Sequence, residues 1–279
     1  MPNNMRTRFL IATTTASVAV ALLLAMTGVA AQQPPAAAAY RAPRAPDGKP
    51  NLNGIWQAMN TANWNVEAHS AGPGPVRDLG AAGAVPAGLG VVDGGEIPYL
   101  PEARKKQQEH YANRLKLDPE VKCYLPGVPR STYMPFPFQI IQSAKHIMLI
   151  HEYAGAVRTI YMSDQTEAPA DSWMGWSNGK WDGETLVVDT KGFNDLSWFD
   201  RAGNFHSDAL HVVERITPRS AETLTYEATI EDPKVFSRPW KMSMPLYRHV
   251  ERNAQILEFR CVEFVEDLLY GHLRKQPGK

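Results

Sequence analysis

The stretch FQIIQSAKHIMLIHEYAGAVRTIYM (residues 138–162) decides the fold class. It contains three short runs of β-branched and aromatic residues, FQIIQS, HIMLIHEY and VRTIYM, separated by tight breaks such as Ala154-Gly155. Runs of this length and composition, bounded by turn residues, are typical of strands joined by hairpins. We therefore predict that the chain forms an antiparallel sheet from Phe138 onward.

Five further runs continue the pattern: ETLVVDT (184–190), LHVVERIT (210–217), ETLTYEATIE (222–231), RPWKMSMPLY (238–247) and QILEFRCVEF (255–264). The pairs Asn178-Gly179 and Asp182-Gly183 predict hairpin turns. About eight antiparallel strands joined by short turns suit a closed up-and-down barrel or a sandwich. We favour a lipocalin-like barrel, because sequential hairpins need no crossovers and closure leaves no exposed edge.

Alternation along two of these runs indicates which side chains face inward. In ETLTYEATIE one face carries Leu224, Tyr226, Ala228 and Ile230, which predicts a half-buried strand. HIMLIHEY is apolar on both faces, which predicts a strand covered on both sides. Its inward face carries either His151 or Glu152, depending on which set of residues points inward.

Residues 1–31 have the features of an export signal. Arg6 and Arg8 precede an apolar run, and the small residues Val29, Ala30 and Ala31 offer a cleavage site. A membrane anchor is the alternative, because the run approaches the length of a bilayer span.

The remainder of the chain reads as a linker followed by one domain. Residues 32–50 are rich in Pro and Ala, which predicts a linker. Residues 51–279 are expected to form a single β-barrel domain with an N-terminal loop and helix extension. Within that extension, the spacing of apolar residues after Pro101 predicts one helix ending near Leu117.

Charge and cysteine content exclude some function classes. The 29 basic and 29 acidic residues balance, so the composition does not indicate a nucleic-acid partner. Cys123 and Cys261 are the two cysteines, and in an exported protein such a pair predicts a structural disulfide. Two buried free thiols are the alternative. No zinc-binding spacing surrounds either cysteine.

The segment from Trp173 to Glu214 concentrates large aromatic and ionisable side chains. The tryptophans Trp173, Trp176 and Trp198 predict the wall of an apolar ligand pocket. Alternatively, some of them plug an end of the barrel. We also assign His206 and Tyr226 to substrate binding.

His211 and Glu214 lie on opposite faces of the strand predicted from Leu210, and spacing does not decide which face is inward. If His211 faces inward, it is a candidate general base with Asp208 as its orienting partner. If Glu214 faces inward, a buried carboxylate with a raised pKa is the acid or base instead. A purely structural alternative places the histidine at the barrel rim, held by Asp208, with Glu214 in a surface ion pair.

Arg158 and Tyr161 are candidates for anchoring a substrate. Glu152, across the same hairpin, is the expected partner of Arg158 and a second candidate acid or base. Such a pair either binds a substrate carboxylate or simply locks the hairpin.

Other chemistries have weaker support in the sequence. His206, Asp208 and His211 would suit zinc or iron if they converged on one point. Ser172 and Ser177 lack the context of a nucleophile elbow. The glycines form neither a phosphate loop nor a dinucleotide fingerprint, so we predict no cofactor.

Five longer motifs are spread along the chain and together span most of it after the export signal: PDGKPNLNGIW (46–56), CYLPGVPR (123–130), WMGWSNGKWDGETLVVDTKGFND (173–195), HSDALHVVER (206–215) and IEDPKVFSRPW (230–240). In these motifs the chain resembles a family of uncharacterised exported bacterial proteins. Members of that family typically end in an Asn-rich tail after the second cysteine, whereas this chain ends in FVEDLLYGHLRKQPGK. The resemblance implies export and assigns no reaction.

We expect a periplasmic or secreted enzyme that needs neither cofactor nor metal. It would perform acid–base chemistry (hydration, elimination, isomerisation or hydrolysis) on a small hydrophobic or aromatic compound in a barrel pocket. The first alternative is a periplasmic lipocalin-like carrier of such a ligand without turnover. The second is a metal-dependent enzyme that uses His206 and His211. We expect no nucleic-acid partner and no membrane association after signal cleavage.

Overall fold

The computed structural model describes residues 40–74, 76–163 and 167–273. These residues belong to one compact unit that begins at Tyr40. The predicted export signal (residues 1–31) and the first part of the predicted linker lie outside the described residues. The rest of that linker lies against the barrel, where Arg44 Nη2 and Glu184 Oε1 form an ion pair of 2.5 Å.

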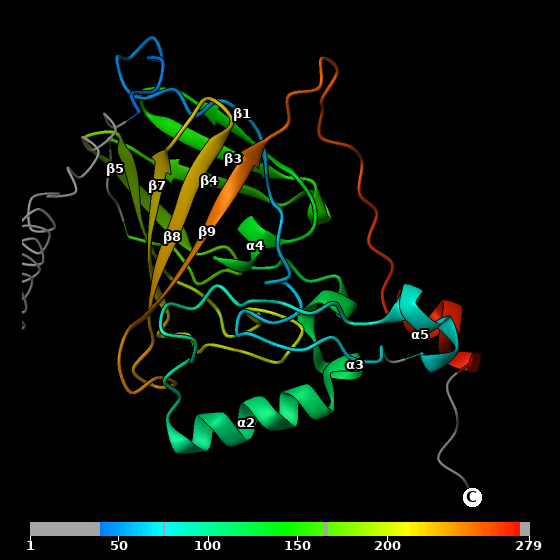
Figure 1. Cartoon of the computed structure of the whole chain (residues 1–279). Helices are drawn as coiled ribbons and strands as arrows, with labels where there is room; N and C mark the ends of the chain where they lie inside the picture. Colours follow the sequence, from blue (N-terminus) through cyan, green and yellow to red (C-terminus); the bar gives the residue numbers. More distant parts are fainter. Residues whose placement is uncertain (1–39, 75, 164–166, 274–279) are drawn as a thin grey trace, which may run out of the picture. The chain divides into compact units, whose positions relative to one another are not determined.

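Nine strands among the described residues form a closed barrel in chain order (Figure 1). They are β1 (Gly54–Ala58), β2 (Phe138–Gln142), β3 (His146–His151), β4 (Val157–Tyr161), β5 (Trp176–Asp182), β6 (Thr185–Lys191), β7 (His211–Pro218), β8 (Thr223–Glu231) and β9 (Trp240–Arg248). Closure is made by the antiparallel pairing of β1 with β9. The predicted lipocalin-like barrel is confirmed.

One pair of neighbouring strands is not antiparallel. β4 and β5 run in the same direction and pair at Ile160 with Ser177 and at Tyr161 with Asn178. The connection between them, residues 162–175, is far longer than a hairpin loop, which allows the chain to return in the same direction. The prediction of a wholly antiparallel barrel is therefore wrong at this pair of strands.

Two local predictions also need correction. Asn178-Gly179 lies inside β5 and is not a turn. Gly179 suits that strand because a Cβ there would approach Met162 Sδ to 2.5 Å. Residues 255–264 form no strand: β9 already pairs with β1, which leaves no sheet edge for QILEFRCVEF to join. By contrast, Asp182-Gly183 does turn the chain from β5 into β6.

Helical segments lie mainly in the chain between β1 and β2. They are η1 (Arg77–Gly83), α2 (Pro101–Ala112), α3 (Arg114–Leu117), η2 (Pro119–Lys122), α4 (Arg130–Tyr133), η3 (Tyr153–Gly155), α5 (Val265–Tyr270) and η4 (Gly271–Leu273). The helix predicted from Pro101 to Leu117 is present as α2 and α3, with an interruption at Asn113. No helix of the described residues is both long and apolar enough to span a bilayer.

The barrel interior follows the predicted alternation. On β8 the side chains of Leu224, Tyr226, Ala228 and Ile230 are at most 1% exposed. On β3 the inward residues are Ile147, Leu149 and His151, so His151 and not Glu152 faces the interior.

The long connection between β1 and β2, residues 59–137, adds a second apolar layer that we call the extension. Val66, Ile97 and Ala103 of the extension belong to the same buried core as Trp198 and the barrel strands. Figure 1 shows α2 beyond one end of the strands, with loops between.

The predicted disulfide is confirmed. Cys123 of the extension is bonded to Cys261, with their Cα atoms 5.7 Å apart. Cys261 lies in the segment after β9, which has little regular structure before α5. The bond therefore fixes this C-terminal segment to the extension.

Candidate functional site

Arg158 and Glu214 form a buried ion pair inside the barrel. Arg158 Nη1 donates to Glu214 Oε1 at 3.0 Å, and Nη2 donates to Oε2. Tyr226 Oη also donates to Glu214 Oε1, at 2.8 Å. Glu214 and Tyr226 have no solvent-accessible surface, and Arg158 is 3% exposed. Of the two faces of β7, the inward one therefore carries Glu214.

Two hydroxyl groups complete this interior cluster. Arg158 Nε donates to Ser177 Oγ on β5, and Nη2 donates to Thr190 Oγ1 on β6, both at 2.8 Å. Burial, followed by the neighbouring charge of Glu214, raises the pKa of Tyr226 well above its ordinary value. Tyr226 is consequently a hydrogen-bond donor, not a phenolate, at any physiological pH. The predicted pairing of Arg158 with Glu152 is replaced by the pair with Glu214.

His151 lies beside the interior cluster as an unprotonated base. Burial, and then the charge of Arg158, lowers its pKa from 6.5 to about 3. Among the described residues, neither ring nitrogen has a side-chain hydrogen-bond partner, although the ring lies next to the backbone of Ser131. Its ring centroid is 5.2 Å from that of Phe138. Burial and the charge of Arg158 both disfavour the protonated ring, so His151 stays neutral in the folded protein.

A shallow hollow outside β4 and β5 brings together four residues that we expect to bind substrate. It has a volume of about 330 Å³, and its lining includes Arg158, Tyr161, Trp173 and Trp176. Tyr161 and Trp176 stack with ring centroids 4.4 Å apart. Arg158 contributes to the lining while its guanidinium points to the other side, into the barrel. This hollow therefore lies on the outer side of the barrel wall, opposite the interior cluster.

The remaining predicted residues lie apart from both. His211 is on the outer face of β7, where Nε2 is 3.0 Å from Asp189 and Nδ1 is 3.4 Å from Glu231. Asp208 pairs with Lys234 at the surface and not with His211. Glu152 accepts a bond from the backbone N–H of Leu257 and does not enter the barrel.

His206 and Trp198 are buried against the extension side of the core. His206 Nε2 is 2.8 Å from Ser197 Oγ, and Nδ1 is 2.9 Å from the carbonyl of Ser207. Because a carbonyl only accepts, Nδ1 carries the proton and Nε2 accepts from Ser197. Trp198 stacks on His110 of α2, with the ring centroids 4.5 Å apart.

His206, His211 and Asp208 thus have three different sets of partners. Within the described part of the chain, no group of three or more His, Cys, Asp or Glu side chains is placed to hold a metal ion.

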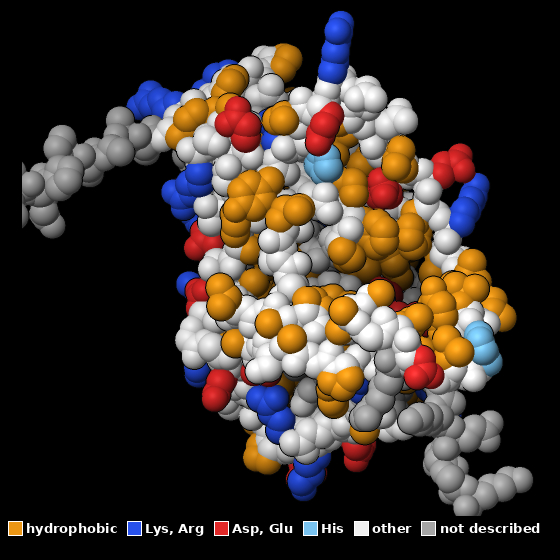
Figure 2. Space-filling model, turned by 45° about the vertical axis from the view of Figure 1, so that its right-hand side comes forward, with side chains coloured by type: hydrophobic (Ala, Val, Ile, Leu, Met, Phe, Trp, Pro, Cys, Tyr) orange, Lys and Arg blue, Asp and Glu red, His pale blue; other side chains and the backbone are white. Residues whose placement is uncertain are grey.

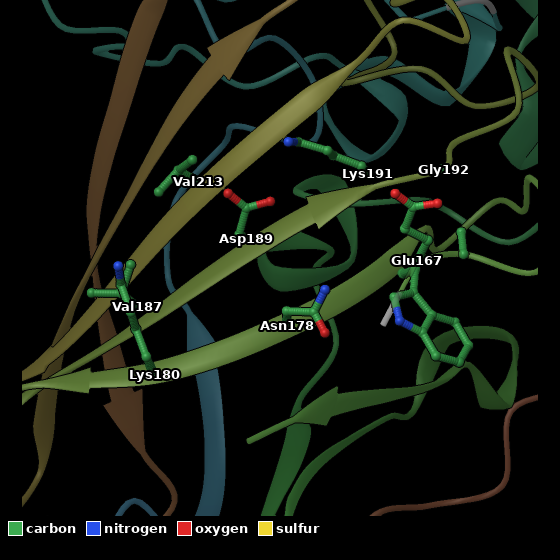
Figure 3. A pocket seen from close by; sticks show the side chains of 10 residues that line it. Glu167, Asn178, Lys180, Val187, Asp189, Lys191, Gly192 and Val213 are labelled. Carbon is green, nitrogen blue, oxygen red and sulfur yellow. The ribbon is translucent and has the colours of Figure 1, made fainter. Parts of the chain in front are cut away.

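A polar groove of about 580 Å³ lies on the outer face of β5, β6 and β7 (Figure 3). Lys180, Asp189 and Lys191 project into it beside Val187 and Val213. Opposite charges alternate along its floor, which is the usual pattern of a solvated sheet face.

Two further hollows lie where the extension meets the C-terminal segment, and we call them together the end pocket. The first, of about 460 Å³, is lined by residues that include Trp64, Tyr111 and Arg114. The second, of about 340 Å³, is mostly apolar. Its walls include Phe136, Tyr153, Phe259, Val262 and Phe264. Both hollows are bounded by Leu115, Val121, Arg201 and Glu266, so they lie on two sides of these residues.

Aromatic rings form one wall of the second hollow. The ring centroid of Phe259 is 4.9 Å from those of Phe136 and Tyr153. Figure 2 shows apolar side chains gathered around a hollow on the face that is turned forward.

A charged network forms the floor of the end pocket. Glu120 accepts two bonds from Arg201, at 2.8 and 2.6 Å, and one from Arg130 at 2.6 Å. Arg130 also donates to Asp118 at 3.1 Å. Burial alone would raise the pKa of Glu120, but the bonds from Arg201 and the charge of Arg130 lower it below its ordinary value. Burial prevails at Asp118, where the pKa is raised.

The end pocket was missed in the sequence because its residues come from distant segments with no shared local pattern. One signal was available. The predicted disulfide places the neighbours of Cys123 beside those of Cys261, and these neighbours include Glu120 and Phe259.

No protein-family model matches the chain, and no curated protein is significantly similar to it. The geometry of the described residues is therefore the basis for a functional assignment.

Proposed function

We propose that the protein binds a small hydrophobic or aromatic molecule in the end pocket and acts as a carrier of it. One observation carries the proposal: an apolar hollow of about 340 Å³, with four aromatic side chains in its lining, adjoins a buried guanidinium–carboxylate network. Small-molecule sites are typically concave and apolar, with a few fixed polar groups that orient the ligand.

The interior of the barrel supports this role less well than the end pocket does. Glu214 and Tyr226 have no accessible surface, so no water-sized space lies beside them. Both carboxylate oxygens of Glu214 already accept hydrogen bonds. A ligand in the barrel would have to displace this packing, whereas the end pocket is open without rearrangement.

The disulfide supports a location in the periplasm or outside the cell, because such bonds persist in oxidising compartments. An exported carrier would meet hydrophobic compounds from the surroundings there. Neither a metal nor a cofactor enters this proposal.

Binding can be tested with N-phenyl-1-naphthylamine, an uncharged probe whose fluorescence rises in apolar surroundings. We expect saturable binding to the purified protein. Val262→Trp should weaken it at least about tenfold, because the indole would fill the hollow that Val262 lines. Val250→Trp is the matched control, since Val250 is equally apolar and 70% exposed but lines neither hollow. Absence of saturable binding, or equal effects of the two variants, would reject the proposal.

Acid–base catalysis at the interior cluster is a second candidate, favoured by the unprotonated His151, whose pKa is lowered by the charge of Arg158, the partner of Glu214. It requires a substrate to enter between β4 and β5. Ligand extracted from purified protein should then be converted by the wild type but not by His151→Asn. His146→Asn, on the exposed face of the same strand, is the control. No conversion by the wild type would exclude this candidate for the extracted ligand.

A further inference from the structure

We infer that Arg201 anchors a carboxylate group of the ligand at the junction of the two hollows, and that Glu266 occupies this position when no ligand is bound. The inference rests on the proposed binding function and specifies its ligand class as hydrophobic or aromatic carboxylic acids.

The guanidinium of Arg201 is held in one orientation. Its Nε and Nη2 donate to the two oxygens of Glu120, at 2.8 and 2.6 Å. The ring of Trp64 covers one face of the guanidinium, 4.6 Å from its central carbon. A fixed, planar guanidinium is suited to a second carboxylate on its remaining edge.

That remaining edge has a weak occupant. Arg201 Nη1 donates to Glu266 Oε1 at 3.3 Å, clearly longer than the bonds to Glu120. The Glu266 side chain is 37% exposed, whereas that of Glu120 is 11% exposed. Half-exposed ion pairs of this kind contribute little to stability, so Glu266 is readily displaced into solvent.

Charge balance favours replacement by another carboxylate. Arg130 and Arg201 face Asp118, Glu120 and Glu266, and exchanging Glu266 for a ligand carboxylate leaves the charges against Arg201 unchanged. A neutral ligand group that displaced Glu266 would leave Arg201 with one carboxylate fewer. The positive charge of Arg201 therefore favours ligands that carry a carboxylate.

The hollows on either side define what the carboxylate is attached to. Because Arg201 and Glu266 bound both, a carboxylate at Arg201 leaves the rest of the ligand beside Phe136, Tyr153 and Phe259. These rings would pack against an aromatic ring or a short aliphatic chain.

Calorimetric titration with a matched pair of probes tests the inference. We expect 4-phenylbutanoate to bind roughly tenfold more tightly than its neutral analogue 4-phenylbutanamide at pH 7.5, because charge-assisted hydrogen bonds are the stronger kind. Glu266→Gln should increase the affinity for the carboxylate several-fold and leave that for the amide unchanged. Glu263→Gln, an exposed residue of the same segment that lines neither hollow, should change neither affinity.

The outcomes separate this inference from the proposed function. Equal affinity for the two probes, or an unchanged ratio in Glu266→Gln, would overturn the carboxylate site. Saturable binding of N-phenyl-1-naphthylamine in the same preparation would leave the carrier proposal standing. Loss of both kinds of binding would reject both.

Discussion

His151 should make the stability of this protein strongly dependent on pH. Its pKa is about 3 in the folded protein, against 6.5 for an ordinary histidine, because burial and Arg158 disfavour the charged ring. The folded state therefore binds fewer protons than the unfolded chain between these two values. The contribution of His151 to the free energy of unfolding is complete above pH 6.5 and is lost as the pH falls towards 3.

The magnitude follows from the size of the shift. Each pH unit in this window changes the free energy of unfolding by about 1.4 kcal/mol. From pH 6.5 to pH 4 the loss due to His151 is therefore about 3 kcal/mol. This is a large fraction of the free energy of unfolding of a typical domain, which is about 5–15 kcal/mol.

Urea unfolding at pH 7.5, 5 and 4 measures this loss. His151→Leu replaces the ring with a non-titrating side chain of similar size, so its stability should fall less between pH 7.5 and 4 than that of the wild type, by about 3 kcal/mol. The exposed His146, on the same strand, provides the control His146→Asn, which should keep the wild-type profile. Asp200 acts in the opposite direction, because burial raises its pKa to about 7, but it is present in all three proteins and cancels in the comparison. Identical profiles for the wild type and His151→Leu would refute the reasoning.

Three further predictions concern the elements that hold the fold together. Arg158→Met should destabilise the protein by roughly 3–5 kcal/mol in urea unfolding, because it leaves Glu214 buried and uncompensated. The double variant Arg158→Met/Glu214→Leu should recover much of that loss, and no recovery would argue against the ion pair as its source. Tyr226→Phe should cost about 1–2 kcal/mol by the same measurement, since it removes one hydrogen bond from Glu214, and a neutral effect would show that this bond contributes nothing net. Replacing Cys123 and Cys261 together by serine should lower the free energy of unfolding by up to about 5 kcal/mol, because the bond closes a loop of 138 residues in the unfolded chain, and an unchanged unfolding midpoint would contradict this.

The strands and the disulfide were predictable because their signals are local or compositional. Period-two alternation fixed the inward face of β8, and the cysteine pair had no competing partner in the sequence. β5 was hidden because Asn178-Gly179 resembles a turn, and the reason for a glycine there, the closeness of Met162 and Ile160, is visible only in the folded chain. The failed strand at 255–264 has adequate composition, but β1 occupies the edge it would need.

The chemistry was predictable only in part. Both faces of β7 carry plausible residues, and the choice between His211 and Glu214 is made by pairing with β6 and β8. The partner of Arg158 comes from a strand 56 residues away in sequence, which becomes a neighbour only when the barrel closes. Arg201 and Phe259 were missed because the end pocket forms only where segments far apart in the sequence come together.

The interior cluster has a mechanical consequence for the barrel. Arg158 on β4 bonds to Ser177 on β5, Thr190 on β6 and Glu214 on β7, and Tyr226 reaches Glu214 from β8. These bonds cross the place where β4 and β5 share their short parallel ladder. Arg158 thus braces four successive strands from within, and Tyr226 joins the fifth strand to them through Glu214. Without the Arg158 side chain, the barrel should open first between β4 and β5. The amide protons of these two strands would then be the earliest to exchange with solvent.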